Sequence, residues 1–381
     1  MQMNASTNID TVHKKPIFIL AGEESGDMHG SFLVKEMLKI NPDLYFIGHG
    51  GDKMKDAGVD IIKHISELSL VGLTEIIKHL PSILREMNET VDLIKKIKPA
   101  RIILIDYPGF NLRLAKKIYK LKIPITYFIL PQVWAWKENR IKKLKIYIDQ
   151  TISIIPFEKD WYKTRGMDIN YVGHPLADME MPLLTKKDFF NRHAFNTEKP
   201  LLTLLPGSRQ QEIERHWPIF LEIIKELHKT FSALQFIVGR APNVRLKHIP
   251  DYVKVETENS YLPMRYGTAG LVASGTATLE ATVFKLPIVL CYKTSAITHL
   301  IGKSVAKVKY LSLTNLISNK KIIPELIQNE MIPRRLIKAI IPLLSDTPER
   351  TKMLCGYENV IVQLGKPGVY YRAAKIISEK I

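Results

Sequence analysis

The sequence is poor in cysteine and has no long apolar run. Its 381 residues include only two cysteines, Cys291 and Cys355, which excludes a disulfide framework or a cysteine-based zinc site and fits a reducing compartment. No apolar stretch approaches the roughly 18 residues that a membrane-spanning helix needs. The polar residues 1–15 contain no apolar core of the kind found in secretory signals. We therefore expect any contact with a membrane to occur at its cytoplasmic surface.

Motifs for a bound metal or nucleotide cofactor are also missing. Residues 302–304 (Gly-Lys-Ser) lack the upstream glycine of a P-loop, and residues 48–51 (Gly-His-Gly-Gly) lack the further glycine of a dinucleotide fingerprint. There is no His-Glu-x-x-His and no Asp-x-Asp of the kind that holds a divalent ion on a nucleotide sugar. The 11 histidines show no metal-ligand spacing. The sequence therefore predicts neither an essential metal nor a cofactor.

Negative charge is scarce. The 38 Asp and Glu residues are outnumbered by 55 Lys and Arg, which leaves a net charge of +17. This excess implies an anionic partner, such as nucleic acid, an acidic membrane surface or a phosphorylated substrate. Five basic residues follow Trp136 within one short run, although such a run is usually a solvated face: Lys137, Arg140, Lys142, Lys143 and Lys145.

Short apolar runs alternate with helical patterns along both halves of the chain, which is typical of βαβ units and parallel sheets. Between residues 173 and 200 the pattern breaks into turns rich in Pro, Asp and Lys, which predicts a linker. We expect two doubly wound α/β domains that face each other across a cleft. The predicted strands are 16–20, 44–47, 101–105, 125–130 and 152–155 in the first half, and 201–205, 235–238, 253–255, 269–272 and 287–290 in the second.

Two strand-to-helix turns in the second half suggest a nucleotide site. Gly207, Ser208 and Arg209 join the strand 201–205 to a helical pattern whose first backbone N–H groups have no partner within the helix. Those N–H groups, the helix dipole and the Arg209 guanidinium together favour a phosphate or pyrophosphate. A second turn rich in Gly, Ser and Thr spans residues 273–280, and the pair suggests a nucleotide bound at the carboxyl end of a parallel sheet.

Two carboxylates in these turns have alternative roles. Asp106 follows the strand 101–105 and can act as a general base toward a substrate hydroxyl, but Asp is also a good N-cap for the next helix. Glu280 lies in the first turn of a helix, where the dipole favours a carboxylate, and it is also placed to accept hydrogen bonds from ribose hydroxyls. Position alone leaves both questions open.

Further candidates lie in the first half. Trp134 and Trp136 follow the strand 125–130, and core aromatics are the simpler interpretation. An apolar cluster before a basic amphipathic helix is either an ordinary core face or a patch that dips into a membrane interface: Leu68, Leu70, Val71, Leu73, Ile76, Ile77 and Leu80. A dense polar turn after the first strand favours a binding site, although Ser25 or Asp27 can simply cap the next helix: Gly22, Glu23, Ser25, Gly26 and Asp27.

Ten segments, each modest alone, occur together in one order: AGEESGD (21–27), IGHGGDKM (47–54), LSLVGLTEI (68–76), IDYPGFN (105–111), PQVWAW (131–136), PFEK (156–159), VGHPLAD (172–178), LLPGSRQQEI (204–213), ASGTATLE (273–280) and SLTNLI (312–317). Together they resemble the lipid A disaccharide synthases, membrane-associated glycosyltransferases of lipopolysaccharide assembly in Gram-negative bacteria. The resemblance implies a GT-B fold with two Rossmann-type domains, 1–178 and 179–355, and a helical segment 356–381 that crosses back onto the first domain.

The resemblance also implies an activity. Such an enzyme transfers the sugar of UDP-2,3-diacylglucosamine to 2,3-diacylglucosamine 1-phosphate with inversion and without a metal, and gives a β-1,6-linked disaccharide 1-phosphate and UDP. Asp106 would be the general base, and Arg209 would stabilise the leaving UDP. The expected donor site comprises Gly207, Ser208, Arg209, Ser274, Gly275, Thr276, Glu280 and Asn315. The expected acceptor side comprises Gly22, Glu23, Ser25, Gly26, Asp27 and Trp134.

With this resemblance, the apolar cluster around Leu70 favours a membrane-dipping or acyl-binding surface over core. The positive charge then fits anionic inner-membrane phospholipid and a phosphorylated acceptor, not nucleic acid, and we expect a peripheral protein at the cytoplasmic face of the inner membrane. The sequence does not determine whether two copies of the chain form a homodimer. The alternative is another GT-B UDP-sugar enzyme of the cell envelope, which would not be expected to combine AGEESGD, PQVWAW and the apolar cluster. A basic module for nucleic acid or membrane would explain neither phosphate turn.

Overall fold

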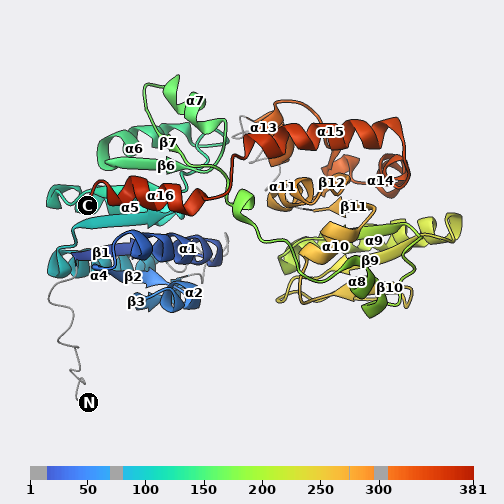
Figure 1. The fold of residues 1–381 in the computed structure, drawn as a ribbon, viewed down its shortest axis with the longest axis horizontal. Coiled ribbons are helices and arrows are strands. Elements are labelled where there is room, and N and C mark those ends of the chain that lie inside the picture. Colours follow the sequence, from blue (N-terminus) through green and yellow to red (C-terminus); the bar gives the residue numbers. More distant parts are fainter. Residues whose placement is uncertain (1–14, 69–79, 274, 296–307) are drawn as a thin grey trace, which may run out of the picture. The chain divides into compact units, whose positions relative to one another are not determined.

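A computed structural model of the chain describes residues 15–68, 80–273, 275–295 and 308–381 (Figure 1). The chain divides into two compact units, each with its own sheet and core: unit 1 consists of Met1–Asp178 with Lys366–Ile381, and unit 2 of Met179–Gly365. The expected third segment, 356–381, begins inside helix α15 (Pro348–Gln363), so the residues that join unit 1 start only at Lys366. Within the described ranges no helix is long and apolar enough to cross a membrane.

Unit 1 is built on a seven-stranded parallel sheet with the order β3-β2-β1-β4-β5-β6-β7. Side chains of β1 alternate between two buried faces, and Ile17 and Ile19 lie on one side while Phe18 and Leu20 lie on the other. A strand covered on both faces reads as a continuous apolar run, which is why it was visible in the sequence. The strands are β1 (Lys15–Leu20), β2 (Leu44–Gly50), β3 (Val59–His64), β4 (Arg101–Ile105), β5 (Ile125–Phe128), β6 (Gln150–Ser153) and β7 (Asn170–Tyr171).

Helices cover both faces of this sheet. On the face of Ile17, α1 and the C-terminal α16 pack together, and on the face of Phe18 lie α4, α5, α6 and α7. The Asp178 carboxylate accepts hydrogen bonds from the first backbone N–H groups of α16, so the returning chain is capped where it joins unit 1. The helices are α1 (Glu24–Ile40), α2 (Asp52–Asp56), α3 (Ile65–Leu68), α4 (Leu80–Ile97), α5 (Pro108–Ile118), α6 (Ile141–Tyr147), α7 (Glu158–Lys163) and α16 (Val369–Ser378).

Unit 2 has a six-stranded parallel sheet with the order β10-β9-β8-β11-β12-β13. Its strands are β8 (Leu201–Leu205), β9 (Gln235–Gly239), β10 (Val253–Glu256), β11 (Ala269–Val272), β12 (Ile288–Tyr292) and β13 (Glu325–Ile327). Most of its buried side chains form one cluster that includes α9, α14 and α15, and a smaller cluster joins α8 and α10 to Leu201 and Ile237. The helices are α8 (Lys186–Arg192), α9 (Gln210–Thr230), α10 (Tyr261–Tyr266), α11 (Gly275–Val283), α13 (Leu313–Ser318), α14 (Pro333–Ile340) and α15.

The strand order reverses beside the first strand of each sheet. In unit 1, β1 lies between β2 and β4, and in unit 2, β8 lies between β9 and β11. The connections on either side of that reversal run to opposite faces, which opens a crevice at the carboxyl ends of the two central strands. The expected polar turns follow these same strands, β1 and β4 in unit 1 and β8 and β11 in unit 2. Each unit therefore carries its candidate residues at its own topological switch point.

Candidate functional site

Asp106 lies immediately after β4, at the switch point of unit 1. Its backbone is left-handed with φ of 43°, and that of Tyr107 is left-handed with φ of 45°. Such a conformation costs on the order of 1–3 kcal/mol for a residue with a side chain. Hydrogen bonds hold it, because the Asp106 N–H donates to the Phe128 carbonyl (3.0 Å) and the Asp106 carbonyl accepts from the Asn111 amide (2.7 Å). The residue at the N-cap of α5 is Tyr107, so Asp106 is not the helix cap.

The electrostatic surroundings of Asp106 suit a base. The pKa of its carboxyl group is raised to about 6, mainly by burial and also by the negative charge of Glu23, while a hydrogen bond from the Tyr107 N–H opposes the change. A carboxyl group with this pKa is mostly ionised at neutral pH and is more basic than an aspartate in water, as general-base catalysis requires. The influence of Glu23 also means that the turns after β1 and β4 converge.

The turn after β1 is shaped by contact with Tyr107. A Cβ atom on Gly22 would lie 2.3 Å from the Tyr107 ring, so only glycine permits this approach. Gly26 packs against Ala21, while Glu23 and Ser25 are exposed at the start of α1. Gly22 and Glu23 thus lie against the Asp106 turn, whereas Ser25 is exposed and Gly26 allows packing on Ala21.

Asp27 has a structural role instead. Its side chain is buried, and its carboxylate accepts hydrogen bonds from the backbone N–H groups of Gly51 (2.6 Å), Met54 (3.0 Å) and Lys53 (3.1 Å). These donors include the otherwise unpaired N–H groups at the start of α2. Asp27 therefore joins α1 to α2, and the hydrogen bonds given above for its carboxylate are all to the protein backbone.

Trp134 is buried as well, and it leads to a carboxyl group that the sequence did not single out. The indole Nε1 of Trp134 donates to Glu158 Oε1 at 2.7 Å, and the Ser153 hydroxyl donates to the other carboxylate oxygen. Burial raises the pKa of Glu158 to about 7, and the charge of Asp106 adds to the increase, while both hydrogen bonds lower it. Glu158 lies within the PFEK segment, where a single acid between Phe157 and Lys159 gives no sign of burial.

In unit 2, the turn after β8 has the expected path but its donors are occupied. Gly207 has φ of +128°, and a Cβ there would lie 2.7 Å from the Glu212 side chain. The Glu212 carboxylate accepts hydrogen bonds from the N–H groups of Ser208 (3.0 Å) and Arg209 (3.3 Å). The expectation of unpaired N–H groups at this helix end is therefore wrong for these two. An internal carboxylate sits where an anion was expected, and the Ser208 and Arg209 side chains are exposed.

His216, which the sequence analysis did not single out, fixes the base of this turn. Its ring is fully buried, and Nδ1 donates to the Pro206 carbonyl (2.8 Å) while Nε2 accepts from the Lys293 N–H (3.0 Å). Burial lowers the pKa of His216 although the carbonyls of Pro206 and Lys293 favour the charged form. A neutral histidine thus ties the carboxyl end of β8 to that of β12.

The second turn of unit 2 follows β11 and carries Glu280. Gly275 and Thr276 are accessible at the start of α11, and Ser274 lies outside the described residues. Burial raises the pKa of Glu280, partly offset by a hydrogen bond from the Tyr261 hydroxyl (3.5 Å). A carboxyl group in this position can accept hydrogen bonds from the hydroxyls of a sugar.

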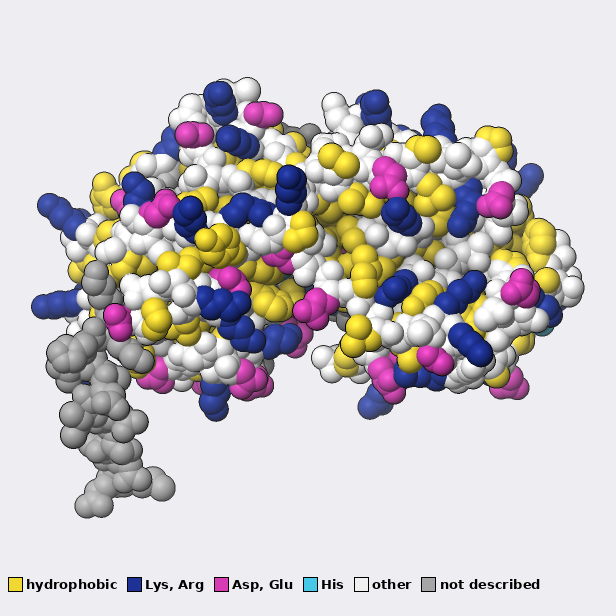
Figure 2. Space-filling model, viewed as in Figure 1, with side chains coloured by type: hydrophobic (Ala, Val, Ile, Leu, Met, Phe, Trp, Pro, Cys, Tyr) yellow, Lys and Arg dark blue, Asp and Glu magenta, His cyan; other side chains and the backbone are white. Residues whose placement is uncertain are grey.

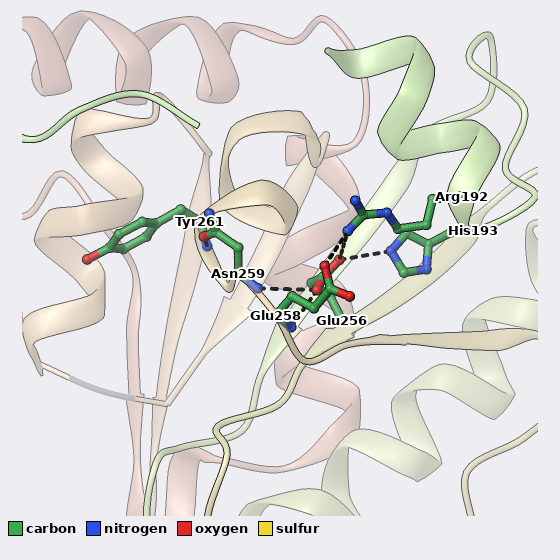
Figure 3. Close-up of polar contacts among 6 residues, drawn as sticks. All are labelled: Arg192, His193, Glu256, Glu258, Asn259 and Tyr261. Atoms are coloured by element: carbon green, nitrogen blue, oxygen red, sulfur yellow. Dashed lines mark hydrogen bonds and ion pairs between the residues drawn. The ribbon is translucent and has the colours of Figure 1, made fainter. Parts of the chain in front are cut away.

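A buried carboxylate supports the turn before α10, the helix that begins at Tyr261 (Figure 3). The Glu256 carboxylate is 2% exposed and binds His193 Nε2 (3.1 Å) and the N–H groups of Glu258 (2.7 Å) and Asn259 (3.2 Å). Burial would raise the pKa of Glu256, but these hydrogen bonds lower it overall. The Asn259 side chain in turn accepts from the Tyr261 N–H at 2.9 Å. The network thereby places Tyr261 beside Glu280.

Asn315 is enclosed and fully bonded. Its Nδ2 donates to the Ile323 carbonyl (2.9 Å) and Glu325 (2.8 Å), and its Oδ1 accepts from the N–H groups of Ile322 (2.8 Å) and Ile323 (2.9 Å). With no exposed surface, it secures the loop before β13 and has no atom free for a nucleotide in this conformation. The residues expected to meet a membrane fall mostly outside the described residues: Leu70, Val71, Leu73, Ile76 and Ile77, with Leu68 at the end of α3.

The comparisons with known proteins decide the family. The family model for lipid-A-disaccharide synthetase matches residues 17–380. The chain belongs to this family. It is 35% identical over 370 residues to the lipid-A-disaccharide synthase of Myxococcus xanthus, covering 95% of this chain and 97% of that one. It is 32% identical to the synthase of Coxiella burnetii, with coverage of 96% and 99%. The chain is therefore a glycosyltransferase of lipid A disaccharide formation.

Solved structures show the fold. The UDP-GlcNAc 2-epimerase of Neisseria meningitidis bound to UDP-GlcNAc aligns with a TM-score of 0.60 at 15% identity, covering 96% of this chain and 98% of the other. The calicheamicin glycosyltransferase CalG4 aligns with the same TM-score, identity and coverage. These neighbours and the two parallel sheets confirm the predicted GT-B fold with two Rossmann-like units. Among the described residues, no group of three or more His, Cys, Asp or Glu side chains is arranged to hold a metal ion.

The occupied turn after β8 generates a prediction. The Glu212→Gln variant keeps an oxygen that can accept from Ser208 and Arg209 but removes the negative charge that opposes a diphosphate. We expect UDP to bind the variant severalfold more tightly, since a charge at a helix N-terminus is worth about 0.3–1 kcal/mol. Calorimetric titration with UDP measures this. Glu214→Gln, which removes an exposed charge from the same helix, is the matched control. Weaker binding to Glu212→Gln would mean that Glu212 helps to form the nucleotide site.

Proposed function

We propose that the enzyme transfers 2,3-diacylglucosamine from its UDP derivative to 2,3-diacylglucosamine 1-phosphate, with inversion and without a metal. The products are the β-1,6-linked disaccharide 1-phosphate and UDP. The observation that carries the proposal is the position of Asp106. It is the base-like carboxyl group at the switch point of unit 1, and the turns that suit a nucleotide diphosphate occupy the switch point of unit 2.

The reaction is a single displacement at the anomeric carbon. The ionised Asp106 accepts the proton of the acceptor 6-hydroxyl, and that oxygen forms a bond to C1 of the donor sugar. The bond from C1 to the UDP oxygen breaks, and its electron pair leaves with UDP. Attack on the face opposite the leaving group inverts the configuration.

The donor groups all belong to unit 2. Arg209 and the Ser208 hydroxyl hold the diphosphate and stabilise the charge that develops on it, which supplies the role that a metal has in other transferases. Gly275, Thr276 and Ser274 contact the phosphates, and Glu280 accepts from the ribose hydroxyls. The Glu212 carboxylate leaves the N–H groups of the β8 turn when the diphosphate arrives.

Product formation tests this function directly. We expect the purified protein, given both substrates in detergent with excess EDTA, to yield a disaccharide 1-phosphate and free UDP, detected by mass spectrometry. Product that appears only after a divalent cation is added would contradict metal independence. If UDP binds and no product forms, the substrates are wrong although the fold is right.

Replacing the base separates chemistry from binding. We expect Asp106→Asn to lower kcat by more than about 100-fold while UDP affinity stays within twofold of the wild type, because the residue lies in unit 1. The wild-type rate should fall as the pH drops through about 6, since the carboxyl group is then protonated. An Asp106→Asn variant with the wild-type rate would exclude the general-base role.

The membrane partner is also part of the proposal. We infer that anionic phospholipid of the inner membrane holds the protein at the cytoplasmic face through the apolar residues between α3 and α4. Replacing Leu70, Val71 and Leu73 by Ser should weaken co-sedimentation with vesicles of phosphatidylglycerol and leave UDP binding unchanged. Unchanged co-sedimentation would assign these residues to core or to acyl binding.

A further inference from the structure

One surface of unit 1 is far more basic than the chain as a whole. Lys and Arg side chains are spread over the visible face of both units (Figure 2), but ten of the 55 lie between residues 113 and 145, on or beside α5 and α6. The sole acidic residue in that stretch is Glu138, which forms a salt bridge with Arg165 at 2.7 Å. Helices α5 and α6 pack side by side on the same face of the sheet. Their solvent side is therefore a strongly positive surface.

Two of these cations lie over an exposed tryptophan, and a third acts on them electrostatically. The Trp136 side chain is 42% exposed, with the Lys137 ammonium 4.3 Å and the Arg140 guanidinium 5.0 Å from its ring centroid. Burial lowers the pKa of Lys137, and the positive charges of Arg140 and Arg113 lower it further, so these cations repel one another. Within the described part of the chain, none of the three forms a salt bridge with a carboxylate. A bound anion would relieve the repulsion among these cations.

The backbone at this cluster is strained. Lys137 has φ of 55° and Ile129, which follows β5, has φ of 64°, the latter being a conformation that β-branched residues rarely adopt. The neighbouring turn after β4 contains the two left-handed residues Asp106 and Tyr107. Strain of this kind persists where the surrounding structure enforces it, and it gathers at ligand sites. The ends of β4 and β5, adjacent in the sheet, share this property.

Tyr127 connects the cluster to the proposed base. Its hydroxyl donates to the Asp106 carbonyl, and the charges of Asp106 and Arg140 both act on that hydroxyl. Arg113 lies on α5, the helix that begins just after Asp106, and its side chain is exposed. Tyr127 therefore links Arg140 to Asp106, and all three cations belong to the same unit.

We propose that Lys137 and Arg140, which lie over Trp136, form a subsite with Arg113 for the phosphate monoester of the acceptor sugar. This inference rests on the proposed function, in which the acceptor carries one phosphate and offers one hydroxyl to Asp106. Guanidinium and ammonium groups supply charge-assisted hydrogen bonds to phosphate oxygens, and the dianion removes the repulsion among the cations. The indole keeps the cations in place and offers an apolar face to the sugar.

A matched pair of variants tests the subsite. Lys137→Gln/Arg140→Gln removes two charges from the cluster, and Lys142→Gln/Lys143→Gln removes two exposed charges from the same surface. Each is assayed with 2,3-diacylglucosamine 1-phosphate and with 2,3-diacylglucosamine, which lacks the phosphate. We expect the cluster variant to raise KM for the phosphorylated acceptor by about tenfold or more with little change in kcat. The wild-type preference for the phosphorylated acceptor should then disappear, and the control variant should keep it.

Equilibrium binding separates this inference from the proposed function. Retention of each acceptor by the protein is measured in detergent micelles without donor, with UDP affinity as the test of correct folding. Loss of the phosphate preference in the cluster variant supports the subsite even if the wild type makes no product. A preference that persists in the cluster variant overturns it. So does a cluster variant that loses binding only to phosphatidylglycerol vesicles, since the cations would then bind the membrane surface.

Discussion

The reversal of strand order beside β1 and β8 is the constraint on which the rest of the structure depends. A parallel sheet directs the carboxyl ends of all its strands to one edge, and the reversal separates the connections there so that a crevice opens between two central strands. The proposed base and the proposed donor site lie at those ends: the Asp106 turn and the polar turn against it in unit 1, and the Gly207 turn and the Glu280 helix in unit 2. The sheets supply rigidity, and the turns supply the functional groups.

The two units handle charge in opposite ways. In unit 2 the positive end of α9 is neutralised by Glu212, a carboxylate of its own first turn, so the turn is stable before any nucleotide arrives. In unit 1 the cations over Trp136 form no salt bridge with a carboxylate among the residues that the structure describes. A site whose positive groups are already paired with a carboxylate of the protein must break that contact when its anion binds. A site whose cations have no such carboxylate gains more binding free energy from its anion. This difference is why the diphosphate turn and the basic cluster need separate experiments.

The sequence predicted the main strands because they are buried on both faces and read as apolar runs. It did not reveal β3, β7 or β13, which are edge strands, are at most half-buried over most of their length and carry little pattern. It located the turns that carry Asp106 and Arg209, since glycine and polar residues end strands in a visible way. It could not show that Glu212 fills the helix end, that Asn315 is enclosed, or that Glu158 and His216 are buried partners. The Glu158 and His216 contacts join segments 24 and 77 residues apart. The Glu212 and Asn315 contacts are local, but the polar residue types do not show whether these side chains turn toward the backbone or toward a ligand.

The features that suit Asp106 to catalysis work against folding. Its pKa rises from 3.8 to about 6 on folding, so the folded chain binds the proton more tightly than the unfolded chain does. The stability that protonation provides is fully present below about pH 4 and is lost as the pH rises through about 6. The enzyme therefore works with this carboxylate in its less stable, ionised form. Two consecutive left-handed residues add to the cost, and the hydrogen bonds from Asn111 and Tyr127 to the Asp106 carbonyl offset part of it. The Asp106 carboxylate is therefore in position before the acceptor binds. The packing and hydrogen bonds of the rest of unit 1 offset the cost of its strained backbone and of its buried charge.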